Sequence, residues 1–254
     1  CNGHRLVASG VGTEQTEQAL RKRFPDVPVH RVDSDSMSGR HAMAIFAQTV
    51  ENADACIMLG TQLLAKGHHF PKVTCVGVLD ADSLLMSPDF RGEERLAQLL
   101  TQVGGRAGRA QRPGEVLIQT RHPEHPIIKA VLEQPWRTLS AQLLSSREAQ
   151  GLPPKGALAA LRCDSADQDA GSAFLTAIMN AYEATTTDPS IRLVGPLSAP
   201  MARRAGLYRS HIVIAGTQRS KVHASVKNLV ALASEHRLPK GLRWFVDIDP
   251  SEPL

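Results

Sequence analysis

Short apolar runs alternate with amphipathic stretches through the first 150 residues. The clearest run, residues 73–80 (VTCVGVLD), is almost continuously apolar, as expected for a parallel strand buried on both faces. The next stretch, residues 93–103 (EERLAQLLTQV), has the period of an amphipathic helix. Further strands are predicted at residues 5–10, 29–33, 55–60 and 114–120, and further helices at 13–25 and 43–50. This alternation predicts an α/β fold with an open, mostly parallel sheet and helices on both faces.

The second part of the chain has a different order of elements. A helical connector at residues 126–150 ends at Gly151-Leu152-Pro153-Pro154, a Gly/Pro cluster that predicts a domain boundary. Beyond it the pattern predicts strand 158–163, helix 170–184, strand 192–195, a long proline-containing turn, strand 208–215, helix 221–236 and strand 243–248. This is the β-α-β-β-α-β order of split ferredoxin-like folds. We therefore expect two domains, residues 1–150 and residues 151–254.

Composition limits the classes of function. The 254 residues are 42% hydrophobic and 21% charged, which is typical of a globular protein. No apolar run reaches the roughly 18–20 residues of a membrane-spanning helix, and no basic-then-apolar secretory leader is found. The net charge of +4 permits a nucleic-acid partner, whereas the aromatic content of 4% argues against a platform of aromatic rings that stack on bases.

The cysteine pattern argues against a disulfide scaffold. The four cysteines, Cys1, Cys56, Cys75 and Cys163, contain no CxxC pair. Cys56 and Cys75 lie within apolar runs, so we expect both to be buried core thiols. A reducing compartment such as the cytoplasm fits this usage. Cys1 opens the chain with no preceding Met, and we expect the chain to be a piece of a longer protein.

The strongest chemical signal lies between the helix that ends near residue 103 and the strand that begins near residue 114. Residues 102–109 read QVGGRAGR, with Gln102 at the start. Glycines allow a ligand or a facing domain to approach the backbone closely. The guanidinium groups of Arg106 and Arg109 suit bidentate contacts with phosphate and can stabilise the charge that develops in phosphoryl transfer. Taken alone, the stretch has an alternative interpretation as a Gly/Arg-rich turn on a basic surface.

Two stretches together resemble a known family. Residues 102–109 resemble motif VI of superfamily 2 helicases (Q-x-x-G-R-x-G-R), and residues 60–71 (GTQLLAKGHHFP), followed by LDAD at 79–82, resemble motif V in the form found in the PriA family of primosomal replication-restart helicases. Other stretches that resemble this family are found, in order, at residues 12–17, 89–95, 122–126, 152–154 and 247–250. The resemblance therefore covers essentially the whole chain.

The resemblance implies an ATP-dependent 3′→5′ DNA helicase in the full-length protein. Residues 1–150 would be its second RecA-like lobe and residues 151–254 its C-terminal domain. The chain contains no G-x-x-x-x-G-K-[ST] phosphate loop, so ATP with Mg²⁺ would be shared with a first lobe, and this chain alone is expected to be inactive. Arg109 is preferred to Arg106 as the arginine finger. Gln102 would help to position the triphosphate and couple the lobes.

The same resemblance implies further site residues. Gly105 and Gly108 would line the nucleotide site. Asp80 would order the motif V loop or a water in the nucleotide cleft, with a helix cap or loop anchor as an equal alternative. Contacts with single-stranded DNA are expected from Thr61, Gln62, Lys66 and His68.

Zinc is implied only for the full-length protein. Cys1 resembles the last cysteine of the family's zinc-binding insertion, and a structural Zn²⁺ site needs four ligands, so this chain cannot complete it. An unliganded terminal thiol is the alternative. The adjacent histidines His68 and His69 are expected to point apart, and the turn with His122 and His125 has no third ligand in view, so we expect solvent-facing or loop-packing roles for both pairs.

The last domain contains a basic cluster. Its members are Arg203, Arg204, Arg209, Arg219 and Lys221. A solvated face is the simplest interpretation. The functional ones are contacts with DNA phosphates at a fork or with the acidic C-terminal tail of single-stranded-DNA-binding protein, a partner that the family resemblance implies. For the tail we expect Arg219, Lys221 and His223, at the start of a helix.

The resemblance also implies partners and a setting for the full-length protein. It would be a monomer in the bacterial cytoplasm, near the nucleoid and away from membranes. There it would recognise stalled or branched forks and start primosome assembly with other primosome proteins. One alternative is another superfamily 2 DNA translocase. Another is a fork-binding scaffold without ATPase activity, against which the intact 102–109 stretch argues.

Overall fold

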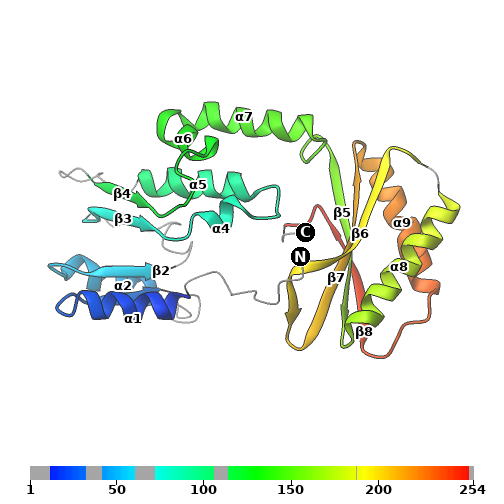
Figure 1. Cartoon of the computed structure of the whole chain (residues 1–254), viewed down its shortest axis with the longest axis horizontal. Helices are drawn as coiled ribbons and strands as arrows, with labels where there is room; N and C mark the ends of the chain where they lie inside the picture. Colours follow the sequence, from blue (N-terminus) through cyan, green and yellow to red (C-terminus); the bar gives the residue numbers. More distant parts are fainter. Residues whose placement is uncertain (1–11, 33–41, 61–71, 106–113, 187, 252–254) are drawn as a thin grey trace. The chain divides into compact units, whose positions relative to one another are not determined.

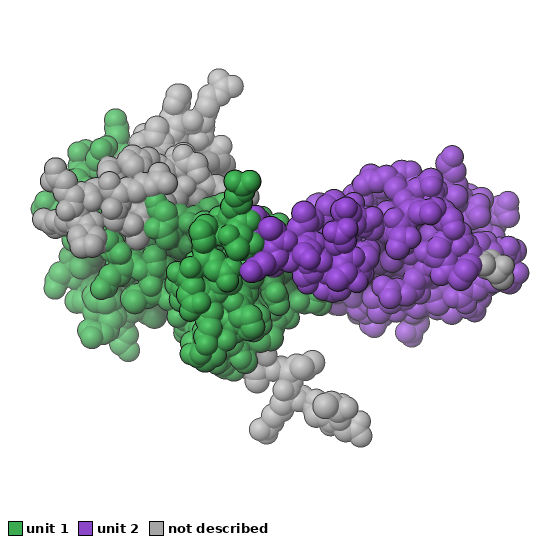
Figure 2. Space-filling view, turned by 90° about the horizontal axis from the view of Figure 1, so that it is seen from above, with its two compact units in different colours: residues 1–139 green, residues 140–254 purple. Residues whose placement is uncertain are grey.

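The computed structural model describes residues 12–32, 42–60, 72–105, 114–186 and 188–251. The chain divides into two compact units, residues 1–139 and 140–254, coloured green and purple in Figure 2. The division lies inside helix α7 (Trp136–Ala149). The boundary predicted at Gly151 comes further along the chain, just after the end of that helix. The strand predicted at residues 5–10 lies outside the described residues.

The first half of unit 1 contains one parallel pair of strands. Its elements are α1 (Thr13–Arg23), β1 (Val29–Val32), α2 (Ala42–Asn52) and β2 (Ile57–Gly60). β1 and β2 pair in register from Val29 with Ile57 to Val32 with Gly60. Phe46 and Val50 of α2 pack on Val32, which is fully buried.

The second half of unit 1 is built around another parallel pair. Its elements are β3 (Cys75–Val78), α4 (Asp82–Leu85), α5 (Gly92–Gly104), β4 (Glu115–Ile118) and α6 (Pro126–Glu133), followed by α7. β3 and β4 pair in parallel and are joined through α5, which makes a β-α-β unit. The apolar positions of α5 recur with the helical period and are buried at Leu96, Leu100 and Val103. The predicted helical connector is divided at Gln134 and Pro135, because a proline disfavours the helical conformation of the residue before it.

Parallel pairing in unit 1 is confirmed, but the expected burial of β3 is wrong. Cys75 and Gly77 share one face of β3 and are exposed, whereas Val78 points to the other face and is buried. Among the described strands β3 pairs only with β4, and β1 only with β2, so two separate pairs stand where one open sheet was expected. Cys75 is accordingly exposed and Cys56 only half-buried, which corrects the prediction of two buried core thiols.

Unit 2 has the predicted β-α-β-β-α-β order. Its elements are β5 (Ala157–Ser165), α8 (Gln168–Thr185), β6 (Ile191–Arg204), β7 (Leu207–Gly216), α9 (Arg219–Glu235) and β8 (Leu242–Ile248). The four strands form one antiparallel sheet in the order β6-β7-β5-β8, and α8 and α9 cover the same face of it (Figure 1). The mixed α/β class is thus confirmed, with parallel pairs in unit 1 and an antiparallel sheet in unit 2.

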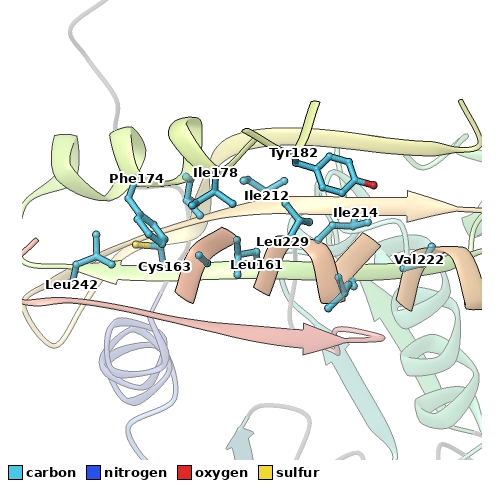
Figure 3. Packing of buried hydrophobic residues seen from close by; sticks show 14 of the residues in the cluster. Leu161, Cys163, Phe174, Ile178, Tyr182, Ile212, Ile214, Val222, Leu229 and Leu242 are labelled. Atoms are coloured by element: carbon cyan, nitrogen blue, oxygen red, sulfur yellow. The ribbon is translucent and has the colours of Figure 1, made fainter. Parts of the chain in front are cut away.

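The core of unit 2 lies between the sheet and its two helices (Figure 3). Leu161 of β5 and Ile212 of β7 point from the sheet into it and are at most 1% exposed. Phe174 and Ile178 of α8 and Leu229 of α9 close it from the helix side. Each such side chain contributes about 1.5–3 kcal/mol by leaving water.

The β6–β7 hairpin corrects the predicted long turn. β6 continues to Arg204, and the turn is the short pair Ala205-Gly206, whose φ angles are 50° and 83°. The prolines at 196 and 200 were interpreted as part of a turn, although both lie within β6. They are tolerated because β6 is an edge strand, where a missing N–H need not break the ladder. The pairing shifts register between Val194 and Leu197 and again between Ser198 and Arg203.

No helix in the ranges that the structure describes is long and apolar enough to cross a membrane.

Candidate functional site

The end of α5 presents the first residues of the Gly/Arg stretch. Gln102 is exposed on the last turn of α5, and its neighbour Val103 is buried. The N–H of Gly105 donates to the carbonyl of Thr101 at 3.1 Å, so the helical turn continues to this residue. A methyl group at Gly104 would meet no heavy atom within 4 Å, so packing inside the unit does not require a glycine here. The other residues of this prediction, Arg106, Gly108 and Arg109, lie outside the described residues.

The opposite end of α5 is fixed by a buried carboxylate. Asp89 has a side chain that is 2% exposed and forms an ion pair with Arg95 at 2.9 Å. It also accepts a hydrogen bond from the backbone N–H of Arg91 at 3.0 Å. Gly92 lies so close to Leu84 and Ser87 that a Cβ would be 2.8 Å from the Cβ of Ser87. Asp89 opens the stretch 89–95 that resembles the family, and in the structure it holds the start of α5.

The carboxyl ends of β3 and β4 are tied together by two aspartates. The N–H of Asp80 donates to the Gln119 side chain at 3.1 Å, and the carboxylate of Asp80 accepts from the Ser83 hydroxyl. Asp82 accepts from the Thr120 hydroxyl at 2.5 Å and from the Arg121 N–H at 2.9 Å. The Thr120 hydrogen bond, followed by the Arg121 one, holds the pKa of Asp82 below its ordinary value.

Asp80 takes the geometry of a loop anchor in this structure. Its φ of 52° lies in the left-handed region, which Asp tolerates better than most residues. Asp82 ends the LDAD stretch that resembles the family, but the sequence did not indicate its two partners, which are 38 and 39 residues away.

The structure does not bring Asp80 together with Gln102 and Gly105. Asp80 follows the carboxyl end of β3, and α5 then returns toward the amino end of β4, as it must between parallel strands (Figure 1). A helix of 13 residues spans about 20 Å, so the two parts of the predicted nucleotide site stand at opposite ends of this β-α-β unit.

The predicted DNA contacts and the predicted zinc ligand cannot be placed. Thr61, Gln62, Lys66 and His68 follow the carboxyl end of β2 directly but lie outside the described residues, as does Cys1. Within the described ranges no group of three or more His, Cys, Asp or Glu side chains could hold a metal ion.

His125 has a structural role. Its Nδ1 accepts from the N–H of Ile127 at 3.3 Å and so caps α6, while its Nε2 lies 4.0 Å from Glu93. A ring nitrogen that caps a helix is not free to bind a metal, which agrees with the loop-packing role expected for this histidine.

The three predicted tail contacts differ in their surroundings. Arg219 and His223 are four residues apart on α9, so they share one face, and both are exposed. Lys221 instead donates to the Ser190 hydroxyl at 2.9 Å and pairs with Asp188 at 3.2 Å. The hydrogen bonds from Ser190, and then that from Lys221, keep the pKa of Asp188 below its ordinary value. Arg219 forms an ion pair with Asp249 at 2.8 Å.

The basic cluster of the sequence is divided in space. Arg203 and Arg204 lie at the turn of the β6–β7 hairpin, whereas Arg219 follows the far end of β7, a strand of ten residues that spans about 33 Å. Arg203 stacks over the ring of Tyr208 at 5.1 Å. Arg209 lies beside Asp164, at 3.8 Å.

A buried polar row, which the sequence analysis missed, crosses the face of the sheet without helices. His211 of β7 stands opposite Arg162 of β5 and is 1% exposed. Neither ring nitrogen of His211 has a hydrogen-bond partner among the described residues. Burial, and then the charges of Arg162 and Arg209, lower the pKa of His211 to about 4, so the ring is neutral near pH 7. In the sequence His211 stands between the polar pair Arg209-Ser210 and the apolar run 212–214, a position that does not indicate burial.

Comparisons with known proteins extend the resemblance seen in the motifs. Residues 148–251 match the family described as "Primosomal protein N C-terminal domain". The chain is 35% identical over 252 residues to the "Replication restart protein PriA" of Haemophilus influenzae, 34% over 250 residues to that of Synechocystis, and 34% over 251 residues to that of Bacillus subtilis. These alignments cover 99%, 98% and 98% of this chain, but only 34%, 29% and 31% of the relatives. The resemblance to the PriA family is therefore confirmed: nearly every residue of this chain aligns with about one third of a replication restart protein.

Proposed function

We propose that this chain is part of a replication restart protein and forms the second half of the ATP site of a DNA helicase. The similarity to proteins named for replication restart, over nearly all of the chain, carries the proposal. The sequence QVGGRAGR at residues 102–109 supplies its chemistry. The phosphate loop and the acidic motif would come from the rest of such a protein, which would also complete the RecA-like arrangement proposed for residues 1–150.

The described part of α5 fits this role. Asp89 and Gly92 hold the start of the helix, and Leu96, Leu100 and Val103 are buried along the rest of it. Gln102 therefore lies on a helix that is packed from its first turn to its last. The space around Gly104 is open, so another lobe could approach the helix closely at this residue. ATP with Mg²⁺ would be held mainly by the first lobe. Arg109, with Arg106, would add positive charge at the γ-phosphate, where phosphoryl transfer develops negative charge.

Single-stranded DNA is the proposed substrate of the loop after β2. Loops at the carboxyl ends of parallel strands are the usual ligand-binding positions in α/β folds, and Thr61, Gln62, Lys66 and His68 occur in this one. These residue types suit contacts with the phosphate backbone, which hold a strand without reading its sequence. Cycles of ATP turnover would then move the protein 3′→5′ along one strand.

The remaining proposals concern the full-length protein. It would recognise stalled forks, start primosome assembly with other primosome proteins, and act as a cytoplasmic monomer near the nucleoid. Cys1 would be one ligand of a structural Zn²⁺. At α9, Arg219 and His223 would receive the acidic C-terminal tail of single-stranded-DNA-binding protein. In that site we assign Lys221 a supporting role, because Asp188 and Ser190 already bind it.

The substitution Arg109→Ala in the full-length protein tests the ATP-site proposal. Loss of an arginine finger lowers turnover by a factor of about 10³–10⁵, so we expect DNA-stimulated ATP hydrolysis to become nearly undetectable. Binding to single-stranded DNA should change by only a few-fold, because the contacts with DNA are elsewhere. The exposed residue Arg237 offers a matched control, and Arg237→Ala should leave turnover unchanged. Wild-type turnover in Arg109→Ala would remove Arg109 from the finger role.

A further inference from the structure

The first turn of α9 carries two cations, and the chain places a carboxylate beside each of them. Lys221 pairs with Asp188, and Arg219 pairs with Asp249. Neither pairing was expected from the sequence, because the partners are 30 or more residues apart. Any acidic peptide that binds at this turn has to compete with these internal carboxylates.

The two pairs are held very differently. Lys221 has two partners, because its ammonium also donates to Ser190 at 2.9 Å, and Asp188 itself accepts from the N–H of Ser190 at 2.9 Å. Asp249 is the one partner of Arg219 among the described residues, and the side chains of this pair are 60% and 41% exposed. Exposed ion pairs are weak, since water solvates both partners when they separate. The Lys221–Asp188 pair is also partly exposed, at 41% and 31%, but Lys221 keeps a second partner in Ser190, so Arg219 is released more easily than Lys221.

Asp249 is the fixed member of its pair. Its N–H donates to the carbonyl of Leu158 at 3.0 Å, which ties it to the start of β5. The next residue, Pro250, is fully buried. The backbone of Asp249 has a φ of 50°, in the left-handed region. The backbone of Asp249 is therefore held in place, and the long side chain of Arg219 can leave the carboxylate by rotation about its own bonds.

The helix end itself favours a negative group. No side chain caps the N-terminus of α9 at Gln218, and its first turn contains no acidic residue. The N–H groups and the dipole at a helix start attract anions. The turn itself carries two cations and no anion, and the carboxylates of Asp188 and Asp249 balance this charge, the second by pairing with Arg219.

We propose that Asp249 is an internal competitor at this site: its carboxylate occupies Arg219 until a carboxylate of an acidic partner peptide replaces it. The inference rests on the proposed tail site at Arg219 and His223 and adds its regulation. When the peptide binds, its carboxylate takes the place of the Asp249 carboxylate on the guanidinium of Arg219. Binding is weakened but not blocked, and a peptide must bring negative charge to displace Asp249.

Peptide titration of the full-length protein tests this proposal. The probe is a fluorescein-labelled synthetic peptide with several aspartates and a free C-terminal carboxylate, followed by fluorescence anisotropy. We expect Asp249→Asn to bind it about two- to five-fold more tightly, as the loss of a weak exposed competitor allows. Asparagine also tolerates the left-handed backbone, so the fold at this position is kept. Arg219→Ala should weaken binding at least five-fold, and the double variant should bind no more tightly than Arg219→Ala.

The control is Glu235→Gln, which makes the same change of charge at the exposed far end of α9. It should leave the affinity unchanged. Equal tightening by Glu235→Gln would show a general effect of net charge and overturn the competitor. So would unchanged or weaker binding by Asp249→Asn while Arg219→Ala still reduces affinity. If Arg219→Ala binds the peptide as the wild type does, the tail site itself is wrong, and the competitor with it.

Discussion

The two units differ in how completely each is built from its own described residues. In unit 2, one antiparallel sheet of four strands and two helices surround a single core, to which every strand and helix contributes buried or partly buried residues. In unit 1, the described strands form two parallel pairs, and one face of β3 and β4 is exposed at Cys75, Gly77 and Leu117.

Physical principles explain the contrast. A sheet of three or more strands with one covered face can be stable on its own, whereas an isolated pair is marginal. Parallel sheets are normally covered on both faces. Unit 2 therefore has the properties of an independent module, and unit 1 those of a part that other surfaces complete, as a helicase lobe in the proposed full-length protein would be.

The largest expected effect is a loss of stability in the core of unit 2. Leu161 is 1% exposed, and Leu161→Ala should lower the free energy of unfolding of this unit by about 2–5 kcal/mol, because it leaves a cavity. Leu117 of unit 1 is 59% exposed, and Leu117→Ala should change stability by less than about 0.5 kcal/mol. Urea unfolding followed by circular dichroism measures both. Equal losses of stability in Leu161→Ala and Leu117→Ala would contradict the difference in packing between the core of unit 2 and the exposed face of unit 1.

A pH effect of similar or smaller size is expected in unit 2. The folded pKa of His211 is about 4, below its ordinary value of 6.5, so the unfolded chain takes up the proton first. The free energy of unfolding is therefore unaffected by His211 above pH 6.5, where the ring is neutral in both states. It falls as the pH drops from 6.5 toward 4, by up to about 3 kcal/mol, because only the unfolded chain readily binds the proton. Urea unfolding at pH 7.5 and 4.5 would measure this loss. His211→Phe should be less sensitive to pH over this range, and equal sensitivity would exclude His211 as the cause.

A smaller effect is expected at the start of α5 in unit 1. The Cβ in Gly92→Ala would press on Leu84 and Ser87, so this substitution should cost about 1–3 kcal/mol. Gly104 lies in the same helix with open space around it, and Gly104→Ala should be neutral or stabilise by up to about 1 kcal/mol. Thermal unfolding of the two variants gives the comparison. If Gly92→Ala is as stable as Gly104→Ala, then the start of α5 is not the close-packed anchor described above.

Much of the fold could be predicted because the hydrophobic period of each short segment indicates a helix or a strand. The β-α-β-β-α-β order of unit 2 follows from alternating and helical periods, and α9 begins two residues before the predicted Lys221. Both strands of the hairpin at 191–216 were predicted, but the length of β6 was underestimated because proline normally ends a strand, and only the sheet order shows that β6 is at an edge. The burial of Cys75 was overestimated because an apolar run does not show whether both faces are covered.

The candidate sites could be predicted only in part, because motifs give residue types but not long-range contacts. The pairs of Asp82 with Thr120, Lys221 with Asp188 and Arg219 with Asp249 all join residues far apart in the chain. Such contacts depend on the complete fold. Arg106, Arg109 and the residues of the loop after β2 stay sequence-based predictions, since they lie outside the described ranges.

The most direct test of the central claim is ATP hydrolysis by the full-length protein, measured with and without forked DNA. We expect hydrolysis that forked DNA stimulates at least ten-fold, together with unwinding of the fork. A folded full-length protein that binds the fork but hydrolyses no ATP would contradict the helicase proposal and favour a fork-binding scaffold.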